Sequence, residues 1–120
     1  MEARVFMYIV NRSIAVIRPR QPFVDWANQL PDAEWESSLD DFKLDCFAVL
    51  IPEYDTDDEA KGCINELYED IFTEMLFGWC TERSWWPQDR TKEMFWEWFE
   101  VELHSMVIDP YADMIKKERL

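Results

Sequence analysis

The sequence predicts an α+β fold, a single small sheet of three or four strands with two principal helices packed on one face. Nineteen of the 120 residues are aromatic, which supplies a dense core although only two glycines are present. Hydrophobic residues make up 48% of the chain, and its length is typical of one domain, residues 1–120. Segments of strand composition and segments of helical spacing follow one another in mixed order, which favours α+β architecture.

The first segment, residues 4–18, is rich in Val, Ile, Phe and Tyr, a composition typical of strands. Two arrangements are open. Val5–Val10 and Ser13–Arg18 form a hairpin that turns at Asn11-Arg12, although the Gly expected after Asn in such a turn is missing. Alternatively, the segment is one long or bent strand. Pro19 ends the strand in either case, because proline has no amide hydrogen to donate.

Pro22 favours the first turn of a helix, and one helical face of apolar residues follows it until Pro31: Phe23, Trp26, Ala27 and Leu30. Residues 32–45 are polar and acidic, so we expect a loop with a short helical turn that begins near Ser38. Three apolar residues are expected to anchor this loop: Trp35, Leu39 and Phe42.

Cys46–Ile51 is a continuous apolar run, which predicts a buried central strand. Thr56 and Glu59 have the spacing of a capping box, with acids concentrated where the helix dipole favours them. The helix that follows is expected to end at Gly78 as its C′ residue. Its apolar face comprises Ala60, Ile64, Leu67, Ile71, Met75 and Leu76.

The last third of the chain predicts a loop, a helix and a strand. The loop covers Trp79–Asp89, and Thr91 caps a helix that continues through Phe99. From residue 101 to 108 the apolar pattern has a period of two, which predicts a strand. The tail from Tyr111 is expected to be a helical turn or frayed.

Charge excludes several classes of partner. The chain has a formal net charge of −14, and residues 21–115 hold 24 acidic and five basic side chains. Such a surface repels nucleic acid and anionic lipid, so we expect no direct nucleic-acid binding. No apolar stretch is long enough for a membrane span, and the N-terminal residues lack the features of a signal peptide. With three scattered cysteines, typical of reduced thiols, these observations predict a cytoplasmic protein.

Motifs for catalysis, metals and cofactors are weak. Asp55, Asp57, Glu59 and Glu66 match part of a calcium loop, but Ala60 stands where the loop needs glycine. Glycine-rich phosphate loops are missing from the sequence, as is a nucleophile elbow. We therefore expect no cofactor, no metal and no catalytic residue.

Two groups of residues are candidate sites. The first is Arg12, Arg18, Arg20 and His104, which would bind an anion or carboxylate ligand, although pairing with the protein's own carboxylates explains the arginines as well. The second is Trp79, Trp85 and Trp86, because tryptophan is enriched at binding hot spots. Adjacent tryptophans do not easily both face one core, so at least one is expected to be exposed. The alternative is that this loop covers the end of the core.

Three stretches carry a resemblance: NRSIAVIRPRQPFVDW (11–26), LIPEYDTDDEA (50–60) and WWPQDRTKEMFWEWFEVELHSMVIDP (85–110). They resemble a group of uncharacterised small acidic bacterial proteins. The resemblance implies a cytoplasmic bacterial protein and brings no activity, ligand or catalytic residue with it.

The sequence thus favours a non-enzymatic interaction module, which uses its acidic surface and its Trp-rich loop to bind a basic protein partner or a second copy in a homodimer. Replacing Trp85 and Trp86 with Ala is expected to weaken the contact without unfolding the domain. One alternative is an acidic nucleic-acid mimic. The other is a small enzyme or ligand-binding domain in which Arg18, Arg20, His104 and a carboxylate share a pocket.

Overall fold

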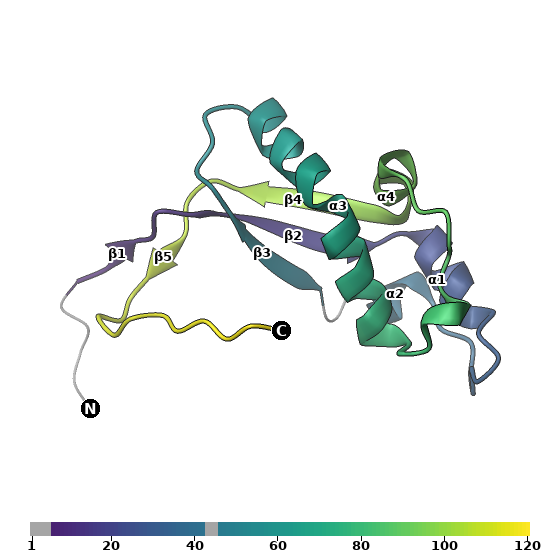
Figure 1. Cartoon of the computed structure of the whole chain (residues 1–120). Helices are drawn as coiled ribbons and strands as arrows, with labels where there is room; N and C mark the ends of the chain where they lie inside the picture. The colour runs from purple at the N-terminus through teal and green to yellow at the C-terminus, as the bar shows by residue number, and fades with distance from the viewer. Residues whose placement is uncertain (1–5, 43–45) are drawn as a thin grey trace.

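The computed structural model describes residues 6–42 and 46–120 (Figure 1). The start of the first predicted strand, at residues 4 and 5, and positions 43–45 of the predicted loop lie outside these residues. In chain order the elements are β1 Tyr8–Ile9, β2 Ser13–Pro19, α1 Gln21–Asn28, α2 Leu39–Phe42, β3 Phe47–Ile51, α3 Asp57–Trp79, the 3-10 turn η1 Arg83–Trp85, α4 Lys92–Trp98, β4 Phe99–His104 and β5 Ile108–Asp109.

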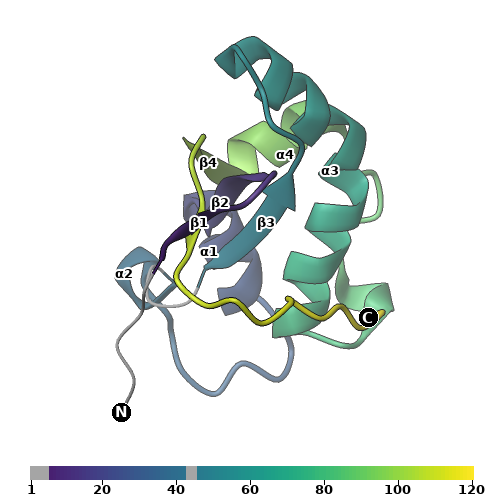
Figure 2. The same cartoon turned by 90° about the vertical axis from the view of Figure 1, so that its left-hand side faces the viewer.

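Strand β2 is the centre of a three-stranded antiparallel sheet in the order β3-β2-β4. Val16 lies opposite Ala48 on one side and Glu102 on the other. Along β2, residues are alternately buried and half-buried, so one face of the sheet is covered and the other is open. Helices α1, α3 and α4 pack on the covered face (Figures 1 and 2). The predicted α+β class is confirmed, although the described strands form a second, two-stranded sheet besides the single one expected.

The prediction that Cys46–Ile51 is a buried central strand is wrong. Strand β3 lies at the edge of the sheet, and Phe47, Ala48 and Leu50 are exposed. An apolar run of this length shows that both faces of the strand are hydrophobic. It does not distinguish a central strand from an edge strand whose outer surface is apolar. Only Ile51 of this strand is fully buried.

The first strand is long and bent, and the hairpin alternative is wrong. Strand β1 pairs with β5, in antiparallel register, and not with β2 (Figure 1). The last pair of the main sheet on this side is Ile14 with His104, and the next pair is Ile9 with Ile108. Four residues separate these pairs on the first strand and three on the other, which is the residue count of a β-bulge and bends the ladder. We call residues 6–12 and 105–110, which include β1 and β5, the arm.

Two further boundaries differ from the sequence prediction. Helix α4 ends at Trp98, and the predicted strand 101–108 is divided into β4 and β5. Gly78 lies within α3 and is not a C′ residue, because the helix continues to Trp79 and Cys80 leaves it in an extended conformation. Neither glycine has a positive φ, so the left-handed turn that glycine serves at a helix end is not made.

The loop before β3 agrees with the sequence in part. The short helical turn predicted near Ser38 is α2, and Asp41 accepts hydrogen bonds from the backbone and the hydroxyl of Ser38. Phe42 is buried, as predicted, whereas Trp35 is exposed and does not anchor the loop. The tail from Tyr111 to Leu120 contains neither helix nor strand, and all of its residues are exposed, so the predicted helical turn is wrong.

Helix α3 is the element that the sequence describes best. Thr56 Oγ1 accepts a hydrogen bond from the Glu59 backbone, and the Glu59 carboxylate accepts one from the backbone of Asp55. The buried side of the helix packs on an aromatic cluster, in which Phe72 lies 5.1 Å from Phe99 and 5.4 Å from Trp98, measured between ring centroids. The buried members of the cluster are Phe23, Phe72, Phe95 and Phe99.

Candidate functional site: a tryptophan-lined depression

The two adjacent tryptophans of the loop after α3 have opposite environments. Trp86 is 5% exposed, and its Nε1 donates to the Cys80 carbonyl at 2.8 Å. The guanidinium groups of Arg83 and Arg90 lie near its ring, 5.3 and 5.9 Å from the centroid. Trp85 is 38% exposed, which confirms that at least one of the pair reaches the surface. Trp86 therefore closes the core, while Trp85 is available to a partner.

Trp85 forms part of a shallow hollow, with a volume of about 470 Å³, that we call the Trp depression. Trp26 and Trp98 contribute half-buried indoles from helices α1 and α4, with ring centroids 6.4 Å apart. Trp26 Nε1 donates to the Trp85 carbonyl at 3.0 Å, which ties α1 to the loop. The lining is completed by Pro22, Asp25, Gln29, Trp86 and Pro87.

The sequence did not identify Trp26 and Trp98 as members of this site. Their spacing assigns both to the apolar faces of their helices. Spacing alone does not show that a large indole at the margin of such a face keeps one side in solvent. Trp79, predicted to join Trp85, instead lies 4.5 Å from the Phe42 ring and lines a different hollow beside Trp35.

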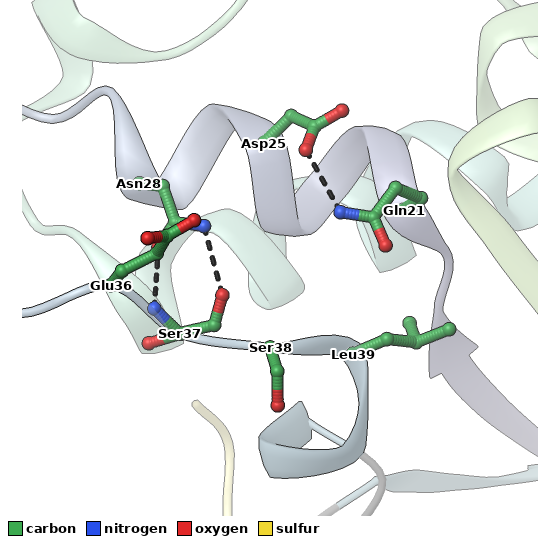
Figure 3. Close-up of a pocket in the computed structure, with 7 residues that line it drawn as sticks. All are labelled: Gln21, Asp25, Asn28, Glu36, Ser37, Ser38 and Leu39. Carbon is green, nitrogen blue, oxygen red and sulfur yellow. Dashed lines mark hydrogen bonds between the residues drawn. The ribbon is translucent and has the colours of Figure 1, made fainter.

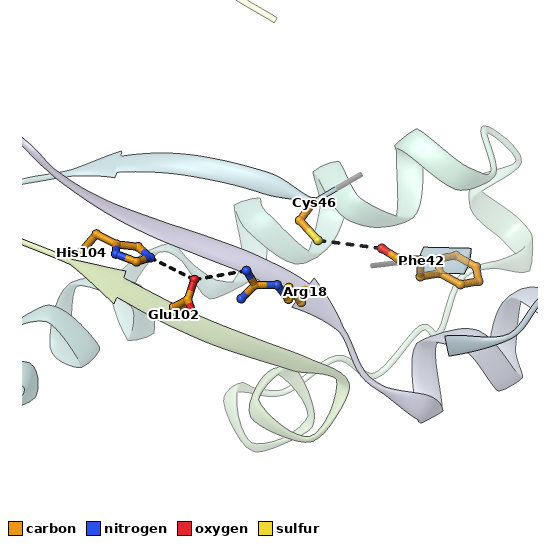
Figure 4. A network of polar contacts seen from close by, with 5 residues as sticks. All are labelled: Arg18, Phe42, Cys46, Glu102 and His104. Carbon is orange, nitrogen blue, oxygen red and sulfur yellow. Dashed lines mark hydrogen bonds and ion pairs between the residues drawn. The ribbon is translucent and has the colours of Figure 1, made fainter. Parts of the chain in front are cut away.

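Arg18 and His104 meet on the open face of the sheet. Arg18 Nη2 donates to Glu102 Oε2 at 3.1 Å, and His104 Nε2 lies 2.9 Å from the same oxygen (Figure 4). Pairing of β2 with β4 places the three side chains on one face. Arg12 donates to the neighbouring carbonyl of Asn11, and Arg20 follows the opposite end of β2, so neither joins this network. The contact of Arg18 favours pairing with the protein's own carboxylates.

The pKa of the Glu102 carboxyl is held below its usual value, first by the hydrogen bond from His104 and then by the one from Arg18. We expect the Arg18→Gln and His104→Ala variants each to raise this pKa, followed by NMR titration of the Glu102 side-chain carbon. Because the folded-state pKa is depressed, the pair's contribution to stability is present above the unfolded-state pKa and is lost as the pH falls through the folded-state value. An unchanged Glu102 titration in both variants would contradict this account.

A polar hollow of about 370 Å³ lies between α1 and the segment before α2 (Figure 3). Asn28 Nδ2 donates to the Ser37 carbonyl at 2.9 Å, and its Oδ1 accepts from the Ser37 backbone at 2.7 Å. Gln21 Nε2 donates to Asp25 Oδ1. The Gln21–Asp25 bond lies within α1, while the two bonds of Asn28 hold the loop against the helix, which gives the hollow a structural role.

Residues 6–42 and 46–120 contain no group of three or more His, Cys, Asp or Glu side chains that could hold a metal ion. Cys46, Cys63 and Cys80 are not joined by disulfides. Burial raises the pKa of the Cys63 thiol, which disfavours the reactive thiolate.

Comparison with known proteins found no family model, no curated protein and no solved structure that matches the chain. Among the described helices, none has the length and apolar character needed to cross a membrane. The candidate site therefore stands on its geometry.

Proposed function

We propose that this protein is a non-enzymatic interaction module that binds a basic segment of a partner protein in the Trp depression. One observation carries the proposal: four tryptophans, of which Trp26, Trp85 and Trp98 are partly exposed, line one hollow together with Asp25. Tryptophan is among the residues most enriched at binding hot spots, and its large face is typically buried by a partner.

The depression is built to keep its shape. Trp85 lies in a loop, but its backbone is fixed by the hydrogen bond from Trp26, and the next residue, Trp86, is anchored in the core. A partner therefore meets indoles that are already positioned, which reduces the conformational entropy lost on binding.

The charge of the chain favours a basic partner. Lys and Arg side chains bind over indole faces by cation–π contacts, and Asp25 supplies a carboxylate next to them. The net charge of −14 accelerates the approach of basic chains and slows that of acidic ones.

Acidic nucleic-acid mimicry stays an alternative proposal. It requires one ordered stripe of carboxylates, whereas acids occur on all four α-helices and on β4. A cytoplasmic location is part of the proposal.

The Trp85→Ala variant tests the site, because Trp85 is exposed while Trp86 is part of the core. The probe is a synthetic decapeptide of alternating Arg and Pro, compared with one of alternating Glu and Pro, in titrations followed by the indole ¹⁵N–¹H signals. We expect only the Arg peptide to shift the Trp85 and Trp98 signals of the unmodified protein. Trp85→Ala should weaken its affinity on the order of tenfold, the effect of a hot-spot residue.

Trp35→Ala is the matched control, because Trp35 is exposed but lines a different hollow. It should bind the Arg peptide with unchanged affinity. Equal binding of both peptides, or unchanged affinity in Trp85→Ala, would refute the proposed site.

A further inference from the structure

The arm presents apolar side chains to solvent on both of its faces. Consecutive residues of a strand point to opposite faces, yet Tyr8 and Ile9 of β1 are both exposed, Ile9 to 71%, and so are Phe6 and Met7 just before them. Across the ribbon, Met106 and Ile108 are exposed as well. The arm projects from the three-stranded sheet, and the molecule has a radius of gyration of 16.9 Å. A compact chain of this length would have about 13–14 Å.

A two-stranded ribbon in water is marginally stable on its own, since it buries little apolar surface. Between the arm and the sheet, two hydrogen bonds hold the two chain segments against each other. Val10 N donates to the Val107 carbonyl at 2.9 Å, and Ser13 Oγ donates to the Ser105 carbonyl at 3.0 Å. The apolar residues beyond these bonds therefore need a cover that the described part of the chain does not supply.

A second apolar surface lies between strand β3 and helix α3. It is a groove of about 590 Å³ that we call the edge groove. Of the described strands, only β2 pairs with β3, so the outer edge of β3 is open to an added strand. Two acids, Asp70 and Glu74, border the groove. Its other lining residues are Cys46, Phe47, Ala48, Val49, Leu67, Ile71 and Leu120.

The tail has the chemistry that this groove requires. It carries apolar Met114, Ile115 and Leu120, and the basic residues Lys116, Lys117 and Arg119 stand among them. The tail runs back beneath β3 and ends beside α3 (Figures 1 and 2). We propose that the protein forms a homodimer in which the arm and tail of each copy pack into the edge groove of the other. This surface is separate from the Trp depression, and the proposal does not depend on it.

The tail of a second copy is a better occupant of the edge groove than the chain's own tail, because packing within one chain leaves apolar side chains exposed. Within one chain only the last residue, Leu120, reaches the groove, and it remains exposed there. Met114 is 88% exposed, and packing of the tail alone would leave the arm uncovered. A reciprocal contact between two copies covers the arm, the tail and the edge groove in one symmetric interface.

Charge and area agree with this arrangement. Residues 13–104, which we call the body, carry 22 acidic and seven basic side chains, so the bodies of two copies repel each other. Residues 6–12 and 105–120 carry three acidic and four basic side chains, which lets an arm and tail approach the other body. Ten exposed apolar side chains there, at on the order of 100 Å² each, supply on the order of 1,000 Å². A stable interface needs about 800 Å² per partner.

Charge reversal tests the proposal by sedimentation equilibrium at low salt. The groove variant is Asp70→Lys with Glu74→Lys, and the tail variant is Lys116→Glu with Lys117→Glu. We expect a two-chain mass for the unmodified protein and at least a tenfold rise in the dimer dissociation constant for each variant. The matched control, Glu93→Lys with Glu97→Lys, reverses charges on α4 outside the groove and should keep the dimer.

Mixing the groove variant with the tail variant identifies the occupant. Each tail then meets a groove of opposite charge only on the other chain, so a mixed dimer should form with nearly the original affinity. Variants that sediment as monomers and stay monomers after mixing would refute exchange of the tail between copies, because the mixed pair restores opposite charges on tail and groove. A single-chain mass for the unmodified protein, or variants that dimerise normally, would also overturn the proposal. Trp85→Ala should remain dimeric, so the two proposals fail separately.

Discussion

Replacing Phe72 with alanine should lower the free energy of unfolding by about 3–5 kcal/mol, the usual cost of removing a buried aromatic side chain. Phe72 is fully buried on α3, and its ring contacts Phe95, Trp98 and Phe99. These three residues cover the end of α4 and the start of β4, so the substitution opens a cavity where helix and sheet meet. The loss is a large part of the 5–15 kcal/mol that typically stabilises a domain.

Urea unfolding, followed by far-ultraviolet circular dichroism, measures this loss. Phe77→Ala is the matched control, because Phe77 lies on the same helix but is 46% exposed and lies outside the buried cluster. It should cost about 1–2 kcal/mol, since it removes less buried area than Phe72→Ala does. Equal losses in the two variants would mean that the cluster around Phe72 does not form the core.

Replacing Trp86 with alanine should cost about 3–5 kcal/mol as well, although this residue lies in a loop. Its indole is buried and contacts Arg83 and Arg90, and its N–H donates to the Cys80 carbonyl just after α3. Trp86→Phe keeps an aromatic ring but leaves that carbonyl without its donor, so we expect a smaller loss of about 1–3 kcal/mol.

Trp85→Ala separates stability from binding in the same loop. Trp85 is 38% exposed and its bond to Trp26 uses the backbone carbonyl, which alanine retains, so the free energy of unfolding should fall by about 1–2 kcal/mol, less than in Trp86→Ala. Parallel urea titrations of the three variants provide the comparison. If Trp85→Ala destabilised the protein as much as Trp86→Ala, both residues would belong to the core. Replacing Trp85 and Trp86 together would disturb core packing as well as partner binding. The single variant Trp85→Ala is therefore the better test of binding.

The sequence predicted best where the signal is local. The cap at Thr56 and the apolar spacing of α3 depend on neighbouring residues, and both are confirmed. Strand order depends on pairing between residues that are distant in sequence. The run Cys46–Ile51 therefore predicted a strand correctly, but its predicted position at the centre of the sheet is wrong. The Gly78 prediction failed because a glycine near the end of a helix permits a left-handed turn but does not require one.

The candidate site was predicted in part for the same reason. The pair Trp85-Trp86 stands out in the sequence, and the expectation that at least one is exposed is confirmed. Trp26 and Trp98 join Trp85 only through the packing of α1 against α4, which no local pattern encodes. The network of Arg18, Glu102 and His104 likewise arises from the pairing of two strands that are distant in sequence.

The strand at the centre of the sheet also sets an order of events during synthesis and folding. Strand β2 ends at Pro19, but its neighbour β4 begins at Phe99, so a long stretch of chain must be made before the sheet can close. Until then β2 can pair with β3 alone, and its second edge is unprotected. Contacts between residues this far apart slow folding, because the intervening chain loses entropy before the contact repays it. A chaperone that shields β2 on the ribosome would therefore act at the step where this protein is most prone to aggregate.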